Sequence, residues 1–383
     1  MRRVLHLTTH LNIGGITSYI KLLVKEMQNM SYEFFVGSSG GTQEKTLQEQ
    51  GVHCLTLNIR TKSELSPKVY AAILPLIQFI RKERIDLIHA HTRVTQVLSW
   101  WVQQFTGIPY VSTCHGFYKR RLGRRLLPAW GDQAIAISIP VGEALVRDFQ
   151  LKSEKVTTIL NAIDIVELEN RYREKDPKVI RLEHNILQEN PVIGIVARVV
   201  EDKGHEFFLR AAAELINTSF PSLKVLIVGD GPYLPTVREL AKRLGIEKST
   251  FFFGSINDVT YALAIIDIFV LPAIWREGFG LSIIEAMAVG KPVIVTNIWA
   301  LNELVQNRVN GLLVNPKDVD ALAGAVSELL QNRSLYEKIS KNGYEMVKRE
   351  FSIAKMAQRM DQLYQQILLQ RSKNGKSCLT VNR

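Results

Sequence analysis

The amino-acid sequence predicts an α/β protein made of two doubly wound, Rossmann-like domains. Two observations support this prediction. Short runs rich in β-branched and apolar residues alternate with segments of helical period along the chain, as in parallel sheets covered by helices on both faces. The chain also has 383 residues, more than the roughly 250 to 300 at which a single core stops growing.

Six predicted strands make up the first half, and helical segments separate them. In chain order the strands are Arg3–Thr8, Glu33–Gly37, Asp86–Ala90, Tyr110–Thr113, Ala134–Ile137 and Val156–Leu160. The start of the chain superficially resembles a signal peptide, but its apolar stretch ends at Thr8-Thr9-His10. We interpret this stretch as the first strand.

A polar, charge-dense stretch from Glu167 to Lys178 follows these strands and is the best candidate for a linker. A second series of strands then begins: Pro191–Ala197, Leu223–Val228, Thr250–Phe253, Ile268–Leu271, Pro292–Val295 and Gly311–Val314. The sequence therefore predicts domains at residues 1–175 and 176–350. It also predicts an amphipathic helix at residues 351–369, which could pack back on the first domain, and a frayed tail at residues 370–383.

Composition excludes several classes of protein. Hydrophobic residues make up 46% of the chain and charged residues 22%, which is not the composition of a disordered or fibrous protein. No apolar run approaches the roughly 18 to 20 residues that a membrane-spanning helix needs. The three cysteines are far apart and include no Cys-x-x-Cys pair, so they indicate neither a disulfide framework nor a zinc site. We expect a cytoplasmic protein.

The net charge of +11 is concentrated in the first half. Its densest cluster is Lys119, Arg120, Arg121, Arg124 and Arg125, followed by Leu126, Leu127 and Trp130. Basic residues interleaved with apolar ones suit an anionic membrane surface, so the protein could be peripheral on the inner face of the membrane. The alternative is a solvated helix face. Binding to nucleic acid is not expected, since no known nucleic-acid-binding module is present.

Two loops indicate binding of an anion. Gly14 and Gly15 lie between the first strand and a helix, where backbone N–H groups can approach an anion closely. Arg198 ends the first strand of the second half, and Lys203 precedes the next helix. Their side chains can converge on a diphosphate from two sides.

A segment of the second half combines a tight turn with two carboxylates. Gly278 and Gly280 follow an apolar strand, and a helix begins near Leu281, so its unpaired N–H groups form another anion site. Glu277 precedes the turn, and Glu285 lies about one helical turn into the helix, between apolar residues. A carboxylate is costly there unless it accepts hydrogen bonds. The two carboxylates could accept hydrogen bonds from the hydroxyls of a ribose and of a sugar. For either residue alone, the alternative is a helix cap or a surface glutamate.

This Glu-x7-Glu spacing, with Arg198, Lys203 and Gly229-Asp230-Gly231-Pro232, resembles the retaining glycosyltransferases of family 4. The resemblance extends over nearly the whole chain, through Gly14-Gly15, Thr113-Cys114-His115-Gly116, Asn161-Ala162-Ile163-Asp164, Gly254 and Asn310-Gly311-Leu312-Leu313-Val314. It implies the GT-B fold, in which two Rossmann-like domains face a central cleft. It also implies transfer of a sugar from a nucleotide diphosphate sugar.

The resemblance also implies roles for individual residues. Arg198 and Lys203 would bind the donor diphosphate, together with backbone N–H groups near Gly14 and Gly15 and from Phe279 through Gly280 to Leu281. Glu285 would bind the ribose, and Glu277 the transferred sugar. His115 would lie beside the sugar near the reacting carbon, and Ile256 beside the base.

No catalytic metal is predicted. Asp318-Val319-Asp320 matches the metal-binding Asp-x-Asp of another glycosyltransferase fold, but it opens a helical pattern, where acidic residues favour the helix N-terminus. The chain departs from the family pattern at two places. Trp299-Ala300 occupies the position of the usual Gly-Gly pair, and Ala197 that of the usual glycine before Arg198.

The leading hypothesis is therefore a retaining glycosyltransferase in cell-surface polysaccharide or lipopolysaccharide synthesis. UDP is favoured as the nucleotide, and a glycan or lipid-linked molecule is expected as acceptor. One alternative is a nucleotide-sugar epimerase or a phosphorylase of the same fold. Another is a non-catalytic protein that binds carbohydrate or a membrane surface.

Overall fold

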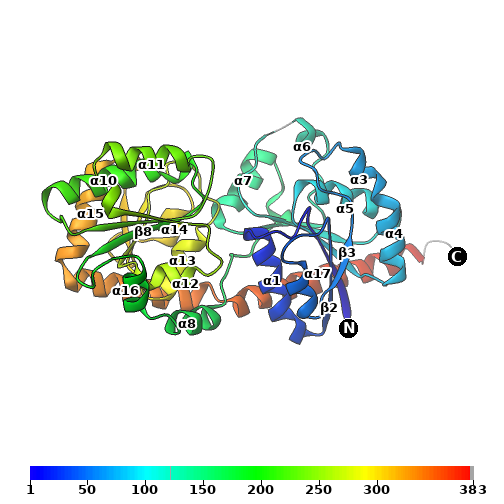
Figure 1. Ribbon diagram of the computed structural model, residues 1–383. Coiled ribbons are helices and arrows are strands. Elements are labelled where there is room, and N and C mark those ends of the chain that lie inside the picture. The colour runs from blue at the N-terminus through cyan, green and yellow to red at the C-terminus, as the bar shows by residue number, and fades with distance from the viewer. Residues whose placement is uncertain (121, 380–383) are drawn as a thin grey trace. The chain divides into compact units, whose positions relative to one another are not determined.

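The computed structural model describes residues 1–120 and 122–379, with side chains up to residue 371. The chain divides into two compact units (Figure 1). Unit 1 contains Met1–Asn161 and the segment that begins at Ile353, and unit 2 is Ala162–Ser352.

The boundary lies earlier than the sequence placed it, at residues 161–162 instead of 175–176. Asp164 caps α8 (Ile165–Arg173), and this helix packs against α12 (Val259–Ile265) and α13 (Leu281–Ala288) of unit 2. Asp176 caps α9 (Pro177–Glu183), which also packs on α12. The charge-dense stretch therefore belongs to two helices of unit 2, and its charged residues are exposed or partly exposed.

Unit 1 is built on a parallel sheet. Among the described residues this sheet has seven strands in the order β3-β2-β1-β4-β5-β6-β7. The strands are β1 (Arg2–Leu7), β2 (Tyr32–Ser38), β3 (His53–Thr56), β4 (Leu87–Ala90), β5 (Tyr110–Cys114), β6 (Gln133–Ala136) and β7 (Val156–Thr158). The helices before the boundary are α1 (Gly15–Met27), η1 (Gln28–Met30), α2 (Glu44–Glu49), α3 (Pro67–Ala71), α4 (Ile73–Lys82), α5 (Arg93–Thr106), α6 (Leu122–Leu126), α7 (Ile139–Phe149) and η2 (Ser153–Lys155).

Unit 2 repeats this architecture. Its described part contains a six-stranded parallel sheet in the order β10-β9-β8-β11-β12-β13. The strands are β8 (Val192–Val196), β9 (Lys224–Val228), β10 (Thr250–Gly254), β11 (Ile268–Leu271), β12 (Val293–Thr296) and β13 (Leu312–Val314). The remaining helices are η3 (Glu201–Lys203), α10 (His205–Thr218), α11 (Leu234–Arg243), η4 (Glu247–Ser249), α14 (Leu301–Leu304), α15 (Val319–Gln331) and α16 (Arg333–Glu350).

The predicted fold class is confirmed, since both sheets are parallel and each predicted strand is found within two residues of its predicted ends. The central strands, such as β4, β5, β11 and β12, are buried on both faces, and their sequences are therefore mostly apolar. The edge strand β3 was not predicted.

The last helix, α17 (Ile353–Leu379), belongs to unit 1 and packs against α1. It continues past the helix end predicted at residue 369, and residues 380–383 lie outside the described residues. Met356, Met360 and Tyr364 of α17 are buried. The Tyr32 hydroxyl donates to the Asp361 carboxylate at 2.7 Å. In the described part of the chain, no helix is both long and apolar enough to cross a membrane.

Candidate functional site

The loops after β8, β9 and β10 are joined by backbone hydrogen bonds at the carboxyl edge of the unit 2 sheet. The N–H of Val199 donates to the carbonyl of Asp230 at 2.9 Å, and the N–H of Gly229 to that of Gly254 at 2.7 Å. Arg198 follows β8 at this edge and is exposed. Ligands of parallel sheets bind at this edge, so Arg198 follows its strand at a position where a ligand can bind.

Lys203 and Glu277 form an ion pair with each other in this structure. Lys203 ends η3, and the next residue, Gly204, has a φ of 73°. A Cβ atom at Gly204 would lie 1.8 Å from the carbonyl oxygen of Pro272, so this position requires glycine. This close approach holds the loop of Lys203 against the segment that leads to Glu277. The sequence predicted both residues as ligand-binding but did not predict that they pair.

The N-terminus of α13 lies at the same edge. Gly280 precedes the helix with a φ of 96°, and Phe279 is buried against the ring of Phe351 at a centroid distance of 5.5 Å. Among the described residues, no side chain caps this helix and its first turn from Leu281 contains no acidic residue. The positive end of the helix dipole is therefore available to an anion.

Glu285 lies one turn further along α13 and is mostly buried. Burial raises the pKa of its carboxyl group from 4.5 to about 7, and the positive charge of Arg171 on α8 opposes this rise only in part. Glu285 is thus close to half-protonated at neutral pH. A ligand hydroxyl that donated to it would stabilise the carboxylate form.

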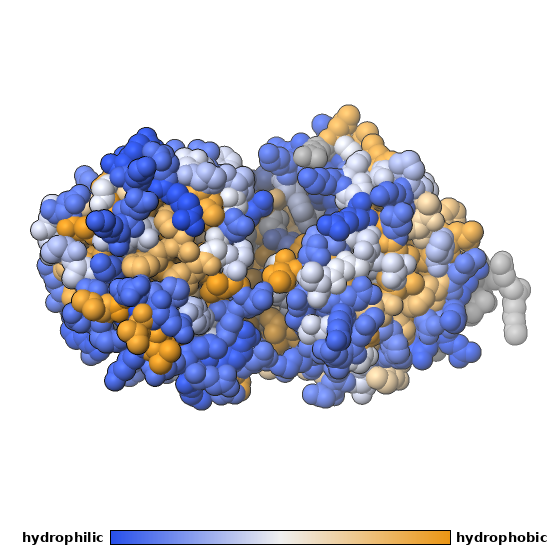
Figure 2. All heavy atoms as spheres, in the orientation of Figure 1, coloured by the Kyte–Doolittle hydropathy of each residue, from blue (hydrophilic) through white to orange (hydrophobic). Residues whose placement is uncertain are grey.

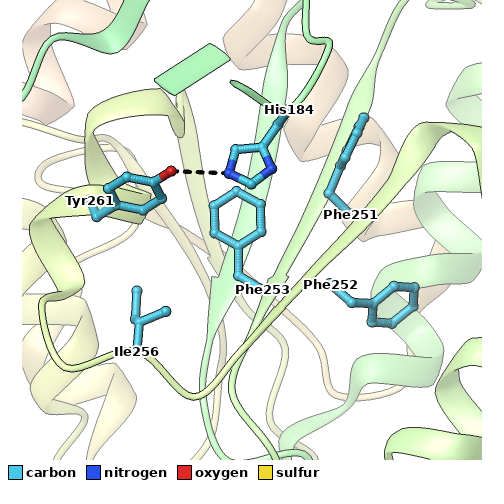
Figure 3. Close-up of a pocket in the computed structure, with 6 residues that line it drawn as sticks. All are labelled: His184, Phe251, Phe252, Phe253, Ile256 and Tyr261. Carbon is cyan, nitrogen blue, oxygen red and sulfur yellow. Dashed lines mark hydrogen bonds between the residues drawn. The ribbon is translucent and has the colours of Figure 1, made fainter. Parts of the chain in front are cut away.

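Ile256 lines an open hollow of about 310 Å³ at the edge strand β10 (Figure 3). The other lining residues are His184, Phe251, Phe252, Phe253 and Tyr261. His184 packs on Phe253 at a centroid distance of 4.2 Å, and its Nε2 is hydrogen-bonded to the Tyr261 hydroxyl at 3.1 Å. Most of the lining residues are aromatic, and the polar groups among them belong to His184 and Tyr261. Such a lining suits a flat ligand. Of the residues predicted to bind the donor, Ile256 is the one that lines it.

In unit 1, Gly14 and Gly15 lie between β1 and α1. A Cβ atom at either position would meet no other atom within 4 Å, so both backbones are open to a ligand. The described first turn of α1 contains no acidic residue. This helix end is therefore a second place where an anion can bind.

His115 follows β5 at the carboxyl edge of the unit 1 sheet and is partly exposed. Its ring stands edge-on to that of Tyr19 at a centroid distance of 4.9 Å. Its Nε2 is hydrogen-bonded to Nδ1 of His91 at 3.1 Å. Burial lowers the pKa of His115 to about 3, so the ring is neutral at physiological pH.

His6, His89 and His91 bring ligand atoms within 4.8 Å of one another, a spacing that a metal ion could use. Nδ1 of His6, however, is bonded to Nε2 of His91 at 2.9 Å. Both nitrogens of His89 are bonded, to the Tyr364 hydroxyl at 2.5 Å and to the Thr113 hydroxyl at 2.6 Å. A metal would have to displace these bonds. These histidines were not predicted from the sequence, although His89 and His91 form a His-x-His spacing at the end of a predicted strand.

Asp318, the first residue of the Asp-x-Asp triplet, caps α15. Its carboxylate accepts a hydrogen bond from the N–H of Ala321 at 2.9 Å. The capping role predicted for this triplet is confirmed.

The loop after β12 contains the residues that replace the usual glycine pair. Ala300 is buried with a φ of 75°, a conformation that costs about 1–2 kcal/mol for a residue other than glycine. The guanidinium of Arg276 lies 5.4 Å from the ring centroid of Trp299. Trp299 therefore adds aromatic surface to the segment that follows β12.

The basic cluster is not the continuous surface patch that the sequence predicted. Arg124 is buried, with its guanidinium over Tyr118 at 3.9 Å, Trp130 at 5.3 Å and Phe149 at 5.8 Å, an arrangement that we call the aromatic box. Including Arg124 in a surface patch was therefore wrong. Arg120 is bonded to Asp148 at 2.7 Å. Lys119 and Arg125 are exposed, and Arg121 lies outside the described residues.

The predicted site residues thus gather at two sheet edges. The carboxyl edge of the unit 2 sheet carries Arg198, Lys203, Glu277, Phe279, Gly280, Leu281 and Glu285, and that of unit 1 carries Gly14, Gly15 and His115. Ile256 follows the edge strand β10. In a doubly wound sheet, such edges are where ligands bind.

Two family models match the chain. The model described as Glycosyltransferase Family 4 matches residues 13–167, and the model described as Glycosyl transferases group 1 matches residues 177–346.

Relatives and solved structures agree with these matches. The chain is 27% identical over 309 residues to the UDP-Gal:alpha-D-GlcNAc-diphosphoundecaprenol alpha-1,3-galactosyltransferase of Escherichia coli, covering 76% of this chain and 78% of that protein. It is 25% identical over 388 residues to the N-acetyl-alpha-D-glucosaminyl L-malate synthase of Bacillus anthracis, covering 98% and 100%. The crystal structure of Anabaena HepE in complex with UDP-glucose has a TM-score of 0.82 and 22% identity, covering 96% of this chain and 100% of that one.

Proposed function

The chain belongs to the family 4 glycosyltransferases and has the GT-B fold, and from this premise we propose that it transfers a sugar from a UDP-sugar, with retention of configuration, to a lipid-linked acceptor. Its function as a glycosyltransferase that uses nucleotide sugars in glycan synthesis follows from the family. The choice of UDP is supported by the relative whose name includes UDP-Gal and by the solved structure that contains UDP-glucose.

The observation that carries the proposal is the set of groups at the carboxyl edge of the unit 2 sheet. Arg198 is exposed there, Lys203 is paired with Glu277, and the N-terminus of α13 is uncapped among the described residues. Breaking a bond between a sugar and a diphosphate builds negative charge on the leaving nucleotide. Fixed cations and a helix N-terminus stabilise that charge in the transition state.

The ion pair with Glu277 gives Lys203 a partner before substrate binds. A diphosphate would compete with Glu277 for the ammonium group, and the carboxylate that it released would be able to accept hydrogen bonds from sugar hydroxyls. From the family resemblance we also propose that the neutral imidazole of His115 binds the sugar. No second carboxylate is needed as a nucleophile if the donor phosphate itself acts as the base.

The first experiment measures sugar transfer by Arg198→Ala and Lys203→Ala. Losing one preorganised donor at developing charge costs about 3–4 kcal/mol, so each variant should lose roughly 100- to 1000-fold in kcat. Lys248→Ala is the matched control, because this exposed lysine lies in η4, before the amino end of β10. Wild-type rates in both site variants would remove the phosphate-binding assignment.

The nucleotide and the reaction type need separate measurements. A thermal-shift series with UDP, GDP and ADP should show the largest stabilisation with UDP; equal shifts would leave the base unassigned and refute the choice of UDP.

The donor incubated without acceptor should remain unchanged, whereas an epimerase would convert it. Proton NMR of the product should show the same anomeric configuration as the donor.

Catalysis without a metal is also part of the proposal. The one acidic triplet that resembles a metal motif caps α15, and the described histidines with metal-compatible spacing are bonded to protein groups. Transfer should therefore persist in excess EDTA. Loss of activity in EDTA that returned with added Mg²⁺ or Mn²⁺ would contradict this.

The lipid-linked acceptor is supported by the surface of α6 in unit 1. Leu122 and Leu126 on this helix are 70% and 75% exposed, with Lys119 and Arg125 exposed beside them. Figure 2 shows apolar spheres gathered over this part of the surface next to hydrophilic ones. Apolar side chains flanked by basic ones suit an anionic bilayer interface. We place the protein on the inner face of the membrane.

Co-sedimentation with vesicles tests this surface. The double variant Leu122→Ser/Leu126→Ser should lose binding to vesicles that contain anionic lipid, and wild-type binding should weaken as the salt concentration rises. Leu187→Ser is the control, because Leu187 is a comparably exposed leucine of unit 2. Equal binding by the α6 variant and the control would reject α6 as the contact.

A further inference from the structure

Three histidines of unit 1 form a continuous row of hydrogen bonds, which we call the histidine row. His6 lies in β1, His91 follows β4 and His115 follows β5, and these strands are neighbours in the sheet. Nδ1 of His6 is 2.9 Å from Nε2 of His91, and Nδ1 of His91 is 3.1 Å from Nε2 of His115. The row thus leads from the partly exposed ring of His115 to the fully buried ring of His6.

All three rings are neutral. Burial lowers the pKa of His6 and of His115 to about 3, and burial together with the neighbouring histidines lowers the pKa of His91 well below its usual value. A neutral imidazole has one N–H donor and one acceptor nitrogen. Each hydrogen bond in the row needs one of each, so the choice of tautomer in one ring fixes the other two.

Two arrangements satisfy both hydrogen bonds. In the first, His115 donates inward through Nε2, and the row ends with an N–H on Nε2 of His6. In the second, His6 donates outward through Nδ1, His91 donates to His115, and His115 carries its proton on Nδ1.

The inner end of the row distinguishes the two arrangements. Nε2 of His6 is buried and has no hydrogen-bond partner among the described residues. The first arrangement would leave a donor N–H there, and a buried N–H without an acceptor is rarer in proteins than an acceptor without a donor. The second arrangement leaves only an unused acceptor in the interior and moves the remaining N–H to the partly exposed ring.

The neighbouring side chains hold the rings in place. Tyr19 stands edge-on to both His91 and His115, at centroid distances of 5.7 and 4.9 Å. His89 stacks on His91 at 4.2 Å, and its own ring is fixed between the hydroxyls of Tyr364 and Thr113. Rotation of His91 would break these contacts and both hydrogen bonds of the row.

We propose that His91 and His6 are positioning residues that hold His115 in the tautomer with its proton on Nδ1, so that His115 presents an N–H donor to an oxygen atom of the bound sugar. The sugar as recipient rests on the proposed function, whereas the tautomer follows from the row alone. An N–H group whose direction is fixed before the substrate binds does not have to reorient during the reaction, so no free energy is spent on that reorientation.

Nitrogen NMR of histidine-labelled full-length protein tests the tautomer directly, with the His115 signals identified by their absence in His115→Asn. The expected result is a protonated Nδ1 and an unprotonated Nε2 in His115 of the wild type. A proton on Nε2 of His115 would overturn the proposal. The proposal would also be overturned if His6 and His91 showed the chemical shifts of metal-bound nitrogens and the protein contained about one metal ion per chain.

Two substitutions of His91 separate positioning from packing. His91→Asn places its amide nitrogen near the position of Nδ1, so it keeps a donor for His115, whereas the amide of His91→Gln reaches the position of Nε2 and faces His6. The Asn variant should retain the His115 tautomer and transfer sugar at close to the wild-type rate. The Gln variant should show a mixed tautomer and about a tenfold lower kcat, the effect of one lost hydrogen bond.

Equal loss in both variants, with the tautomer unchanged, would show that His91 only fills space and would overturn the positioning role. Failure of the proposed function has a different signature: no transfer from any UDP-sugar by the wild type, with the Nδ1 tautomer still present. Thermal melting of both variants verifies that they are folded.

Discussion

Glu285 makes the stability of unit 2 depend on pH. Its carboxyl group is mostly buried on α13, and burial raises its pKa from 4.5 to about 7. The folded protein therefore holds a proton on Glu285 at pH values where the unfolded chain has released it. The raised pKa contributes to the free energy of unfolding at low pH, because the neutral carboxyl group carries no cost of burying a charge. This contribution is lost as the pH rises from about 4.5 through about 7.

The size of the effect follows from the two pKa values. Each pH unit between them corresponds to about 1.4 kcal/mol, so complete loss amounts to at most about 3.5 kcal/mol, reduced because solvent reaches part of the side chain. For a unit of this size, 1 kcal/mol moves Tm by roughly 2–4 °C. Glu285→Gln, which is neutral at every pH, should therefore raise Tm by roughly 5–10 °C at pH 8 and leave it unchanged near pH 4.5.

Thermal unfolding of wild type and variant at several pH values between 4.5 and 8 provides the measurement. Glu239→Gln on α11 is the control, because this glutamate is exposed and its substitution should change Tm little at any pH. A difference between Glu285→Gln and wild type that stayed constant with pH would refute the reasoning. So would a variant that was less stable than wild type at pH 8.

Two further predictions concern packing. Arg124→Ala should lower the free energy of unfolding by about 1–2 kcal/mol, because it removes the cation from the aromatic box. The control Arg125→Ala should change the free energy of unfolding by less than about 0.5 kcal/mol. Urea titration measures both values, and equal effects would contradict the stabilising role of the aromatic box. Gly204→Ala should cost about 2–4 kcal/mol and impair transfer, because its Cβ atom would meet the carbonyl of Pro272. Gly245→Ala is its matched control, since Gly245 has the same φ of 73° but an open surrounding, and it should cost about 1 kcal/mol and leave transfer intact.

The fold was predictable because the central strands of both sheets are buried on both faces. Strands such as β9 contain a continuous apolar run, here Val225–Val228. The strand β3 escaped prediction because it is at the edge of its sheet, where two of its four residues, His53 and Thr56, are exposed. An edge strand buries too little surface to need an apolar run.

The domain boundary was misplaced because charge density was taken as the sign of a linker. Residues 167–178 are charged, but Glu169 and Arg173 pair along α8 at 3.1 Å, and Arg171 reaches Asp258 at 3.1 Å. Composition alone does not distinguish a solvated helix face from an extended linker. The cap Asp164 and the proline that begins α9 were the local signals of helices.

The site was only partly predictable for a similar reason. Sequence spacing placed Arg198, Lys203, Glu277 and Glu285 after neighbouring strands, and the structure places all four at one sheet edge. Partners far apart in sequence were not predictable. The pairing of Lys203 with Glu277 depends on the close approach at Gly204, and the burial of Arg124 depends on aromatic residues that come from both sides of it in sequence.

The position of α17 has a consequence for how the molecule is made on the ribosome. The sheet of unit 1 is complete in sequence by residue 158, yet the side chains of Met360 and Tyr364, which are fully buried in that unit, are synthesised only after all of unit 2. Unit 2 is continuous in sequence, and its first and last residues are close, since the N–H of Ile163 donates to the carbonyl of Phe351 at 3.0 Å. Unit 2 can therefore begin to fold during translation, whereas unit 1 cannot bury the residues that pack against α17 until that helix is synthesised.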